Sequence, residues 1–153
     1  MLLSFVLTNC KVATVNKQET MMRKPLKIEK IEERETFSFN ELKTIPIASV
    51  CDTGLKFEKL KKCVSKSIIM HINRKFNAGL AAELPPKKYT IIVNFVINKS
   101  GEIVNIESSG SGFTKLDNEA TRAINLLPIF TPGMIDNKTV NTRYSLPISF
   151  NIQ

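Results

Sequence analysis

YTIIVNFVINKSGEIVNIESSGSGFTKLDNEATRAINLLPIFTPGMIDNKTVNTRYSLPISFNIQ, residues 89–153, is the stretch of the 153-residue chain that decides its fold. It begins with a run of β-branched and aromatic residues, which predicts a strand, and the NKSG turn at 98–101 leads into a second strand. Residues 114–127 have helical spacing, and apolar and polar residues alternate from Arg143 to Ile152, which predicts a last strand. The predicted class is therefore α+β: a small antiparallel three-stranded sheet, built in the order strand, strand, helix, strand and packed against helices.

The last predicted strand carries Pro147, a residue that cannot donate a backbone hydrogen bond to a neighbouring strand. We therefore expect this strand to lie at an edge of the sheet, with position 147 facing outward. An uncovered edge can accept an extended segment of another protein as an additional strand. The residues predicted to bind such a partner are Arg143, Tyr144, Ser145, Leu146, Ile148, Ser149 and Phe150.

A second helix is predicted before this unit, over about residues 55–77, because apolar residues recur there at steps of three and four. The apolar side of this brace helix either packs on the sheet or lies on an anionic membrane surface, and the regular spacing favours packing. With the brace helix, the predicted domain covers residues 45–153, and its core motif covers 89–153. The apolar positions of the helix are Phe57, Leu60, Val64, Ile68, Ile72 and Phe76.

The net charge of +8 is concentrated before the predicted sheet. Residues 52–88 contain nine basic and three acidic side chains, whereas residues 91–153 contain five of each kind. A nucleic-acid-binding module usually carries its positive charge on the surface that reads the nucleic acid. The neutral C-terminal unit therefore argues against that class of function.

The first ten residues, MLLSFVLTNC, are apolar up to Cys10 and too short to span a bilayer, which takes roughly twenty residues. They are interpreted as the remnant of a lipoprotein signal or another secretory signal, with Cys10 as the candidate lipidation site. Asn9 departs from the small residue that usually precedes a lipidated cysteine, and an ordinary N-terminus without export is the alternative. Residues 11–44 are charged and aperiodic and are predicted to be mainly a linker, with a short strand around residues 36–39 as the alternative.

The chain has three cysteines, which leaves one pair if Cys10 carries a lipid. Cys51 and Cys63 would then be available for a disulfide, which an exported compartment allows. The loop between them has a length whose closure stabilises a fold by ~2–3 kcal/mol. The lipid and the disulfide support each other, and the sequence alone establishes neither.

Catalytic chemistry needs polar groups that converge on one point, and the sequence offers no such set. The only histidine, His71, lies on the predicted brace helix without an adjacent carboxylate or a second histidine. The SSGSG loop at 108–112 lacks the lysine and the fixed order of a phosphate-binding loop. We therefore predict no enzyme activity, no cofactor and no metal site.

Residues 93–150 resemble the C-terminal domain of TonB through three motifs in a fixed order. These are the NKSGEI hairpin, the LDNEATRAINLLPIFTPG helix and turn, and the closing YSLPISF strand. In longer relatives a helix precedes the domain, with two cysteines at positions similar to Cys51 and Cys63. The resemblance implies a periplasmic domain that binds outer-membrane transporters by pairing its last strand with their N-terminal segment.

The resemblance thus implies a non-catalytic protein of the cell envelope in TonB-dependent transmembrane transport. Its implied partners are outer-membrane transporters or other envelope proteins, bound in the periplasm with or without a lipid anchor. The sequence departs from TonB in showing neither an N-terminal transmembrane helix nor a Pro-rich stalk, and Pro147 removes one donor from the docking edge. Two alternatives stay open: a complete energy transducer whose start is wrongly placed, and a structural lipoprotein that dimerises through the edge strand.

Overall fold

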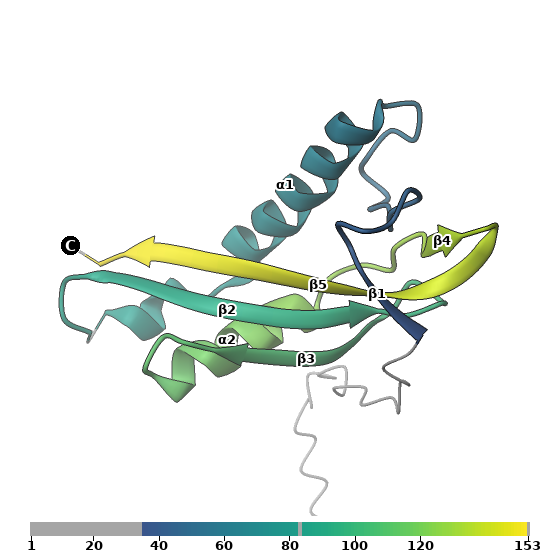
Figure 1. Ribbon diagram of the computed structural model, residues 1–153. Coiled ribbons are helices and arrows are strands. Elements are labelled where there is room, and N and C mark those ends of the chain that lie inside the picture. Colours follow the sequence, from purple (N-terminus) through teal and green to yellow (C-terminus); the bar gives the residue numbers. More distant parts are fainter. Residues whose placement is uncertain (1–34, 83, 153) are drawn as a thin grey trace, which may run out of the picture.

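The computed structural model describes residues 35–82 and 84–152, and it combines five strands with two α-helices (Figure 1). The strands are β1 (Thr36–Ser38), β2 (Lys88–Ile97), β3 (Ile103–Ser109), β4 (Gly133–Ile135) and β5 (Lys138–Asn151). The helices are α1 (Phe57–Lys75) and α2 (Thr114–Asn125), with a short 3-10 helix, η2 (Ala78–Ala81), after α1.

Three antiparallel strands form the centre of the sheet, with β2 between β3 and β5. β2 pairs with β5 without interruption, from Lys88 opposite Asn151 to Ile97 opposite Thr142. The α+β class and the three-stranded antiparallel core predicted from the sequence are thus confirmed. Two short strands make the sheet wider than predicted, because β1 runs parallel to β5 and β4 forms a hairpin with the start of β5.

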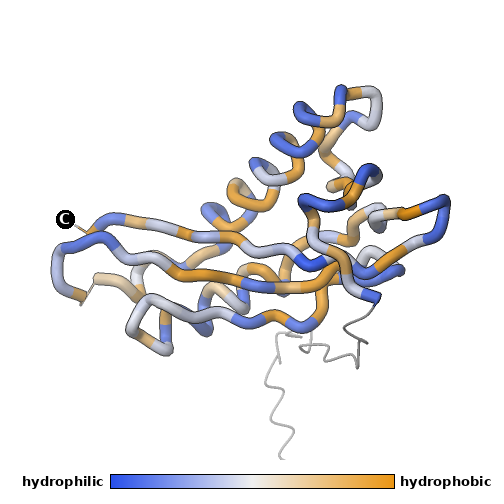
Figure 2. Tube along the Cα trace, viewed as in Figure 1, coloured by the Kyte–Doolittle hydropathy of each residue, from blue (hydrophilic) through white to orange (hydrophobic). Residues whose placement is uncertain are grey.

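Both helices cover the same face of the sheet (Figure 1), and apolar residues alternate along the central strands (Figure 2). On β2, the side chains of Ile91, Val93 and Phe95 are almost completely buried, while that of Ile92 is 46 % exposed on the opposite face. This alternation is what a strand with one packed face requires. The sheet therefore has one face packed on helices and one face that is largely open.

α1 is the brace helix that the sequence predicted, with its ends at Phe57 and Lys75 instead of near residues 55 and 77. Its apolar side is buried in the core, so that side is not available to a membrane surface. The packing interpretation of the helix is therefore confirmed. The buried residues of α1 are Leu60, Val64, Ile68 and Ile72.

The folded domain begins earlier than the sequence predicted. Thr36–Ser38 forms β1, and the side chains of Phe39 and Leu42 are buried in the core. Residues 35–44 therefore belong to the domain, which corrects the linker predicted over 11–44. The alternative of a short strand around residues 36–39 is the one present, and three residues are too few to show a period that would have favoured it over a linker. The predicted signal and the lipidation site at Cys10 lie outside the described residues.

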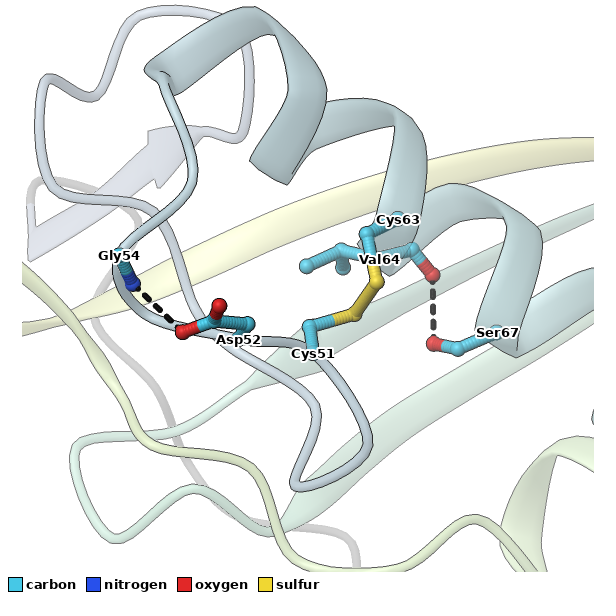
Figure 3. The surroundings of a disulfide bond; sticks show 6 residues. All are labelled: Cys51, Asp52, Gly54, Cys63, Val64 and Ser67. Carbon is cyan, nitrogen blue, oxygen red and sulfur yellow. Dashed lines mark hydrogen bonds between the residues drawn. A yellow bond between two sulfur atoms is a disulfide. The ribbon is translucent and has the colours of Figure 1, made fainter.

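A disulfide joins Cys51, in the segment before α1, to Cys63 on the helix (Figure 3). The two Cα atoms are 6.0 Å apart, an ordinary separation for a disulfide. Beside it, the Asp52 carboxylate accepts a hydrogen bond of 2.8 Å from the amide of Gly54, in the turn that leads to α1 (Figure 3). The pairing of Cys51 with Cys63 predicted from the sequence is thus present in the structure.

Removing this disulfide is expected to lower the free energy of unfolding by ~2–3 kcal/mol, because the cross-link restricts the unfolded chain. Urea unfolding should be measured for the wild type and for the Cys51→Ala/Cys63→Ala variant, with and without a reducing agent. Reduction should lower the unfolding midpoint of the wild type and leave that of the variant unchanged. Equal midpoints for oxidised and reduced wild type would count against a stabilising role of the bond.

Hydrogen bonds of Glu119 and Arg122 on α2 connect this helix to the residues at the end of α1. The side chain of Glu119 is 8 % exposed and accepts hydrogen bonds from the amide of Asn77, at 2.8 Å, and from the guanidinium of Arg122, at 2.6 and 2.8 Å. Arg122 also donates to the carbonyl oxygen of Lys75, the last residue of α1. The hydrogen bond from Arg122 lowers the pKa of Glu119 below its ordinary value of 4.5; burial opposes this effect and the amide of Asn77 adds to it.

The substitution Glu119→Gln is expected to lower the free energy of unfolding by about 1 kcal/mol at neutral pH, because a charged hydrogen bond is lost. The folded-state pKa of Glu119 lies below the unfolded-state value, so its carboxylate stabilises the fold above that value. This contribution disappears as the pH falls through the folded-state pKa. Urea unfolding of both proteins should show a difference at neutral pH that vanishes well below pH 4.5. A difference of the same size at both pH values would refute this explanation.

Candidate functional site

Two hydrogen bonds on opposite sides of β5 fix the direction of each backbone group of this strand. The amide of Ile152 donates to the carbonyl oxygen of Lys87 at 3.1 Å, on the side of β2. The amide of Phe39 donates to the carbonyl oxygen of Arg143 at 3.0 Å, on the side of β1. Because the backbone groups of successive residues in a strand point to alternate sides, even-numbered residues of β5 bond to β2 and odd-numbered residues point to the outer edge.

The outer edge of β5 is open over residues 145–151, within the part of the chain that the structure describes. β1 pairs only with Asn141–Arg143, β4 pairs with residues before these, and no other described strand lies beside β5. Pro147 is an odd-numbered residue, so its backbone faces the outer edge, as predicted. Because proline has no amide hydrogen, this position leaves no unpaired donor at the edge. The outward amides on the open edge are those of Ser145, Ser149 and Asn151.

The residues predicted to bind a partner fall into two groups. The side chains of Tyr144 and Leu146 are buried in the core, and those of Ile148 and Phe150 pack against it. The side chains of Ser145 and Ser149 are exposed on the open face of the sheet. The first four residues therefore support the edge, and a partner strand would meet backbone groups and the two serines.

Arg143 requires a correction to the predicted edge. Its carbonyl oxygen already accepts the hydrogen bond from Phe39, because β1 covers this part of β5. The backbone of Arg143 is thus unavailable to another strand, and the open edge begins at Ser145.

α1 forms a wall beside the open edge. The hydroxyl group of Ser65 lies 2.7 Å from that of Tyr144, near one end of the edge. The ring of Phe76 lies 5.7 Å from the ring of Phe150, near the other end. The helix and the strand therefore run in the same direction, as Figure 1 shows, and a groove lies between them at each end.

The groove at the start of the open edge is called the basic groove below, and its volume is about 680 Å³. Lys62 and Lys66 lie one helical turn apart on α1, are exposed, and form no ion pair with another described residue. Glu58 is the one carboxylate in the lining, so positive charge dominates the groove. The basic residues of the lining are Lys61, Lys62, Lys66 and Arg143.

The groove at the other end, called the apolar groove, has a volume of about 420 Å³ and lies between the end of α1, η2 and the end of β5. It contains no charged side chain among its lining residues, and Asn73 and Asn151 are its polar members. The apolar residues of the lining are Ile72, Phe76, Ala78, Ala81, Ala82, Phe150 and Ile152.

The sequence predicted that the last strand lies at an edge of the sheet, but it did not predict that α1 lies beside this edge. The signal was the spacing of four residues between Lys62 and Lys66, which places both on one side of the helix. A row of lysines on an amphipathic helix usually faces water. Whether it also faces a sheet edge depends on how the helix packs, which a helical period does not reveal.

His71 lies on α1 and is partly buried. Burial lowers its pKa below the ordinary value of 6.5; a backbone hydrogen bond at Ala123 opposes this, and the charges of Lys75 and Arg74 add to it. The imidazole is therefore neutral at neutral pH.

Among residues 35–82 and 84–152, no three His, Cys, Asp or Glu side chains gather where they could hold a metal ion. None of the helices in these residues is long and apolar enough to cross a membrane.

A comparison with protein families matches residues 88–152 to the family described as Gram-negative bacterial TonB protein C-terminal. The match begins with β2 and ends just after β5, so it includes the three-stranded core and the open edge. The curated proteins and the solved structures compared with the chain give no match. Members of the matched family are non-enzymatic protein-interaction domains of the Gram-negative envelope with a role in transport. The segment from β2 to β5 is therefore a TonB C-terminal domain.

Proposed function

We propose that this chain is a non-catalytic periplasmic protein that binds outer-membrane transporters in TonB-dependent transport, by taking one of their extended segments as a strand beside β5. The observation that carries the proposal is the open outer edge of β5 at residues 145–151, within the family's domain. Backbone donors and acceptors alternate there at the spacing of a strand. Each backbone hydrogen bond to a bound segment contributes about 1 kcal/mol.

β3 forms the opposite edge of the sheet and is the poorer docking strand. It has seven residues, and a bulge interrupts its pairing with β2 between Asn94 and Val96. Asn105, within the bulge, has a positive φ of 51°. Bulges twist an edge away from an incoming strand. β5 pairs with β2 without a bulge and therefore offers the more regular template.

Synthetic peptides that cover the N-terminal periplasmic segments of the cell's outer-membrane transporters test the proposal. The full chain should bind at least one of them. N-methylation of every second peptide amide should abolish binding, because these amides donate to β5, while methylation of the intervening amides should leave the affinity nearly unchanged. Binding that tolerates methylation at every position, or a chain that associates only with its own copies, would refute the proposal.

A further inference from the structure

We infer that the outer side of α1 binds a membrane surface that contains anionic phospholipids. The apolar side of the helix stays packed on the sheet, and the lipid meets the opposite side, called the outer ridge below. The inference goes beyond the proposed function, because it adds a second partner and does not depend on strand pairing at β5. The residues of the outer ridge are Lys59, Lys62, Lys66, Ile69, Met70 and Asn73.

The helical period places these six residues on one side of α1. At about 100° per residue, all of them fall within about 60° of Lys66, whereas the buried Val64 and Ile68 fall on the opposite side. All six side chains are exposed in the structure. α1 packs on one face of the sheet (Figure 1), so the outer ridge is a convex surface that faces solvent along the helix.

The first half of the outer ridge is positively charged and carries no acidic residue. Lys59, Lys62 and Lys66 lie within two turns and form no ion pair with another described residue. α1 contains six basic residues and a single acidic one, Glu58, which lies beside the ridge and not on it. Each lysine held near an anionic lipid surface strengthens binding about fivefold. The charge of the ridge therefore complements lipid phosphates.

The second half of the outer ridge adds two neighbouring apolar side chains. Ile69 is 44 % exposed and Met70 is 48 % exposed. On a helix that lies on a membrane, such side chains enter the boundary of the acyl chains. The long apolar stems of nearby lysines let their ammonium groups stay beside the phosphates. Lysines and exposed aliphatic residues on one convex ridge are therefore the combination that a lipid surface requires.

An acidic protein would meet the same charges, but the composition of the ridge favours lipid. Half of its residues are lysines and none is aromatic. Lysine is depleted and aromatic residues are enriched in protein interfaces, whereas lysine is common on the polar side of membrane-surface helices. The ridge and the open edge belong to different elements, α1 and β5, so both can be occupied at once. Binding to lipid would hold the open edge close to a membrane.

Sedimentation of the full chain with vesicles tests the inference. Vesicles of phosphatidylcholine with phosphatidylglycerol should bind the wild type at least about tenfold more tightly than vesicles of phosphatidylcholine alone, and added salt should reduce this preference. Lys62→Gln/Lys66→Gln should weaken binding to the mixed vesicles about tenfold or more. Lys115→Gln/Lys138→Gln makes the same change in net charge at exposed lysines away from α1 and should stay close to the wild type.

Ile69→Ser/Met70→Ser should also weaken binding to the mixed vesicles about tenfold, because these side chains leave water when the helix binds. Urea unfolding should show that every variant is folded. Equal binding to both kinds of vesicle, binding to neither, or an equal loss in the two lysine pairs would overturn the inference. Mixed-vesicle binding unchanged in Ile69→Ser/Met70→Ser would overturn it too. Binding of polyglutamate that requires Lys62 and Lys66, without vesicle binding, would assign the ridge to an acidic protein instead.

Discussion

Replacing Ser149 by proline is expected to weaken the binding of a transporter segment at least tenfold and to change the free energy of unfolding by less than about 1 kcal/mol. The amide of residue 149 points to the outer edge, so proline removes a donor to the added strand and leaves the pairing of β5 with β2 intact. The proline ring also occupies space beside the edge. Pro147 shows that β5 accepts a proline at an outward position.

Ser149→Ala is the matched control for the proline variant. The hydroxyl group of Ser149 lies 2.9 Å from that of Thr90, and both substitutions remove this contact, but only proline removes the amide. Isothermal titration calorimetry should give the alanine variant an affinity close to that of the wild type, and urea unfolding should show that both variants are folded. If folded proline and alanine variants bind equally well, the assignment of the docking edge is wrong.

Gly101→Ala is expected to lower the free energy of unfolding by about 4 kcal/mol or more, a large part of the stability of an ordinary domain. Gly101 ends the turn between β2 and β3 with a φ of +80°, which L side chains rarely adopt. A Cβ atom there would lie 1.7 Å from the carbonyl oxygen of Phe130, a backbone atom that cannot swing aside. The carbonyl oxygen of Gly101 accepts a hydrogen bond of 2.8 Å from the amide of Phe130, so a shift that relieves the clash disturbs this contact.

Gly112→Ala separates the clash from the backbone strain. Gly112 has a similar φ of +78°, but a Cβ atom added there meets no other atom within 4 Å. Its replacement should therefore show only the cost of the left-handed conformation, about 1–2 kcal/mol. Urea unfolding of the two variants measures both effects. Similar losses for Gly101→Ala and Gly112→Ala would mean that the contact with Phe130 does not matter.

The three-stranded core and both helices could be predicted because each has a signal within a few neighbouring residues. Alternation along β5 and the steps of three and four along α1 follow from the burial of one side of each element. Pro147 carried more information than any other single residue, since its missing amide is acceptable only where no strand pairs. The class of the fold, the edge and the outward position all followed from these patterns.

The remaining features depend on contacts between distant parts of the chain. β1 pairs with β5 in parallel, and nothing in the three residues Thr36–Ser38 indicates a partner so far along the sequence. The bulge at Asn105 depends on how β3 fits against β2. The basic groove exists because Ser65 packs next to Tyr144 and thereby sets Lys62 and Lys66 beside the edge. Periodicity shows which side of a helix is buried, but not what lies next to the other side.

Amide hydrogen exchange along β5, measured by NMR with and without a bound transporter segment, tests the central claim that this edge takes up a partner strand. In the free protein, even-numbered amides should exchange slowly because they bond to β2, and the outward amides should exchange fast. Binding should slow exchange at the outward amides and leave the even-numbered ones as they were. Unchanged exchange at the outward amides in the complex, or new protection along β3 instead, would contradict the account. The outward amides are those of Ser145, Ser149 and Asn151.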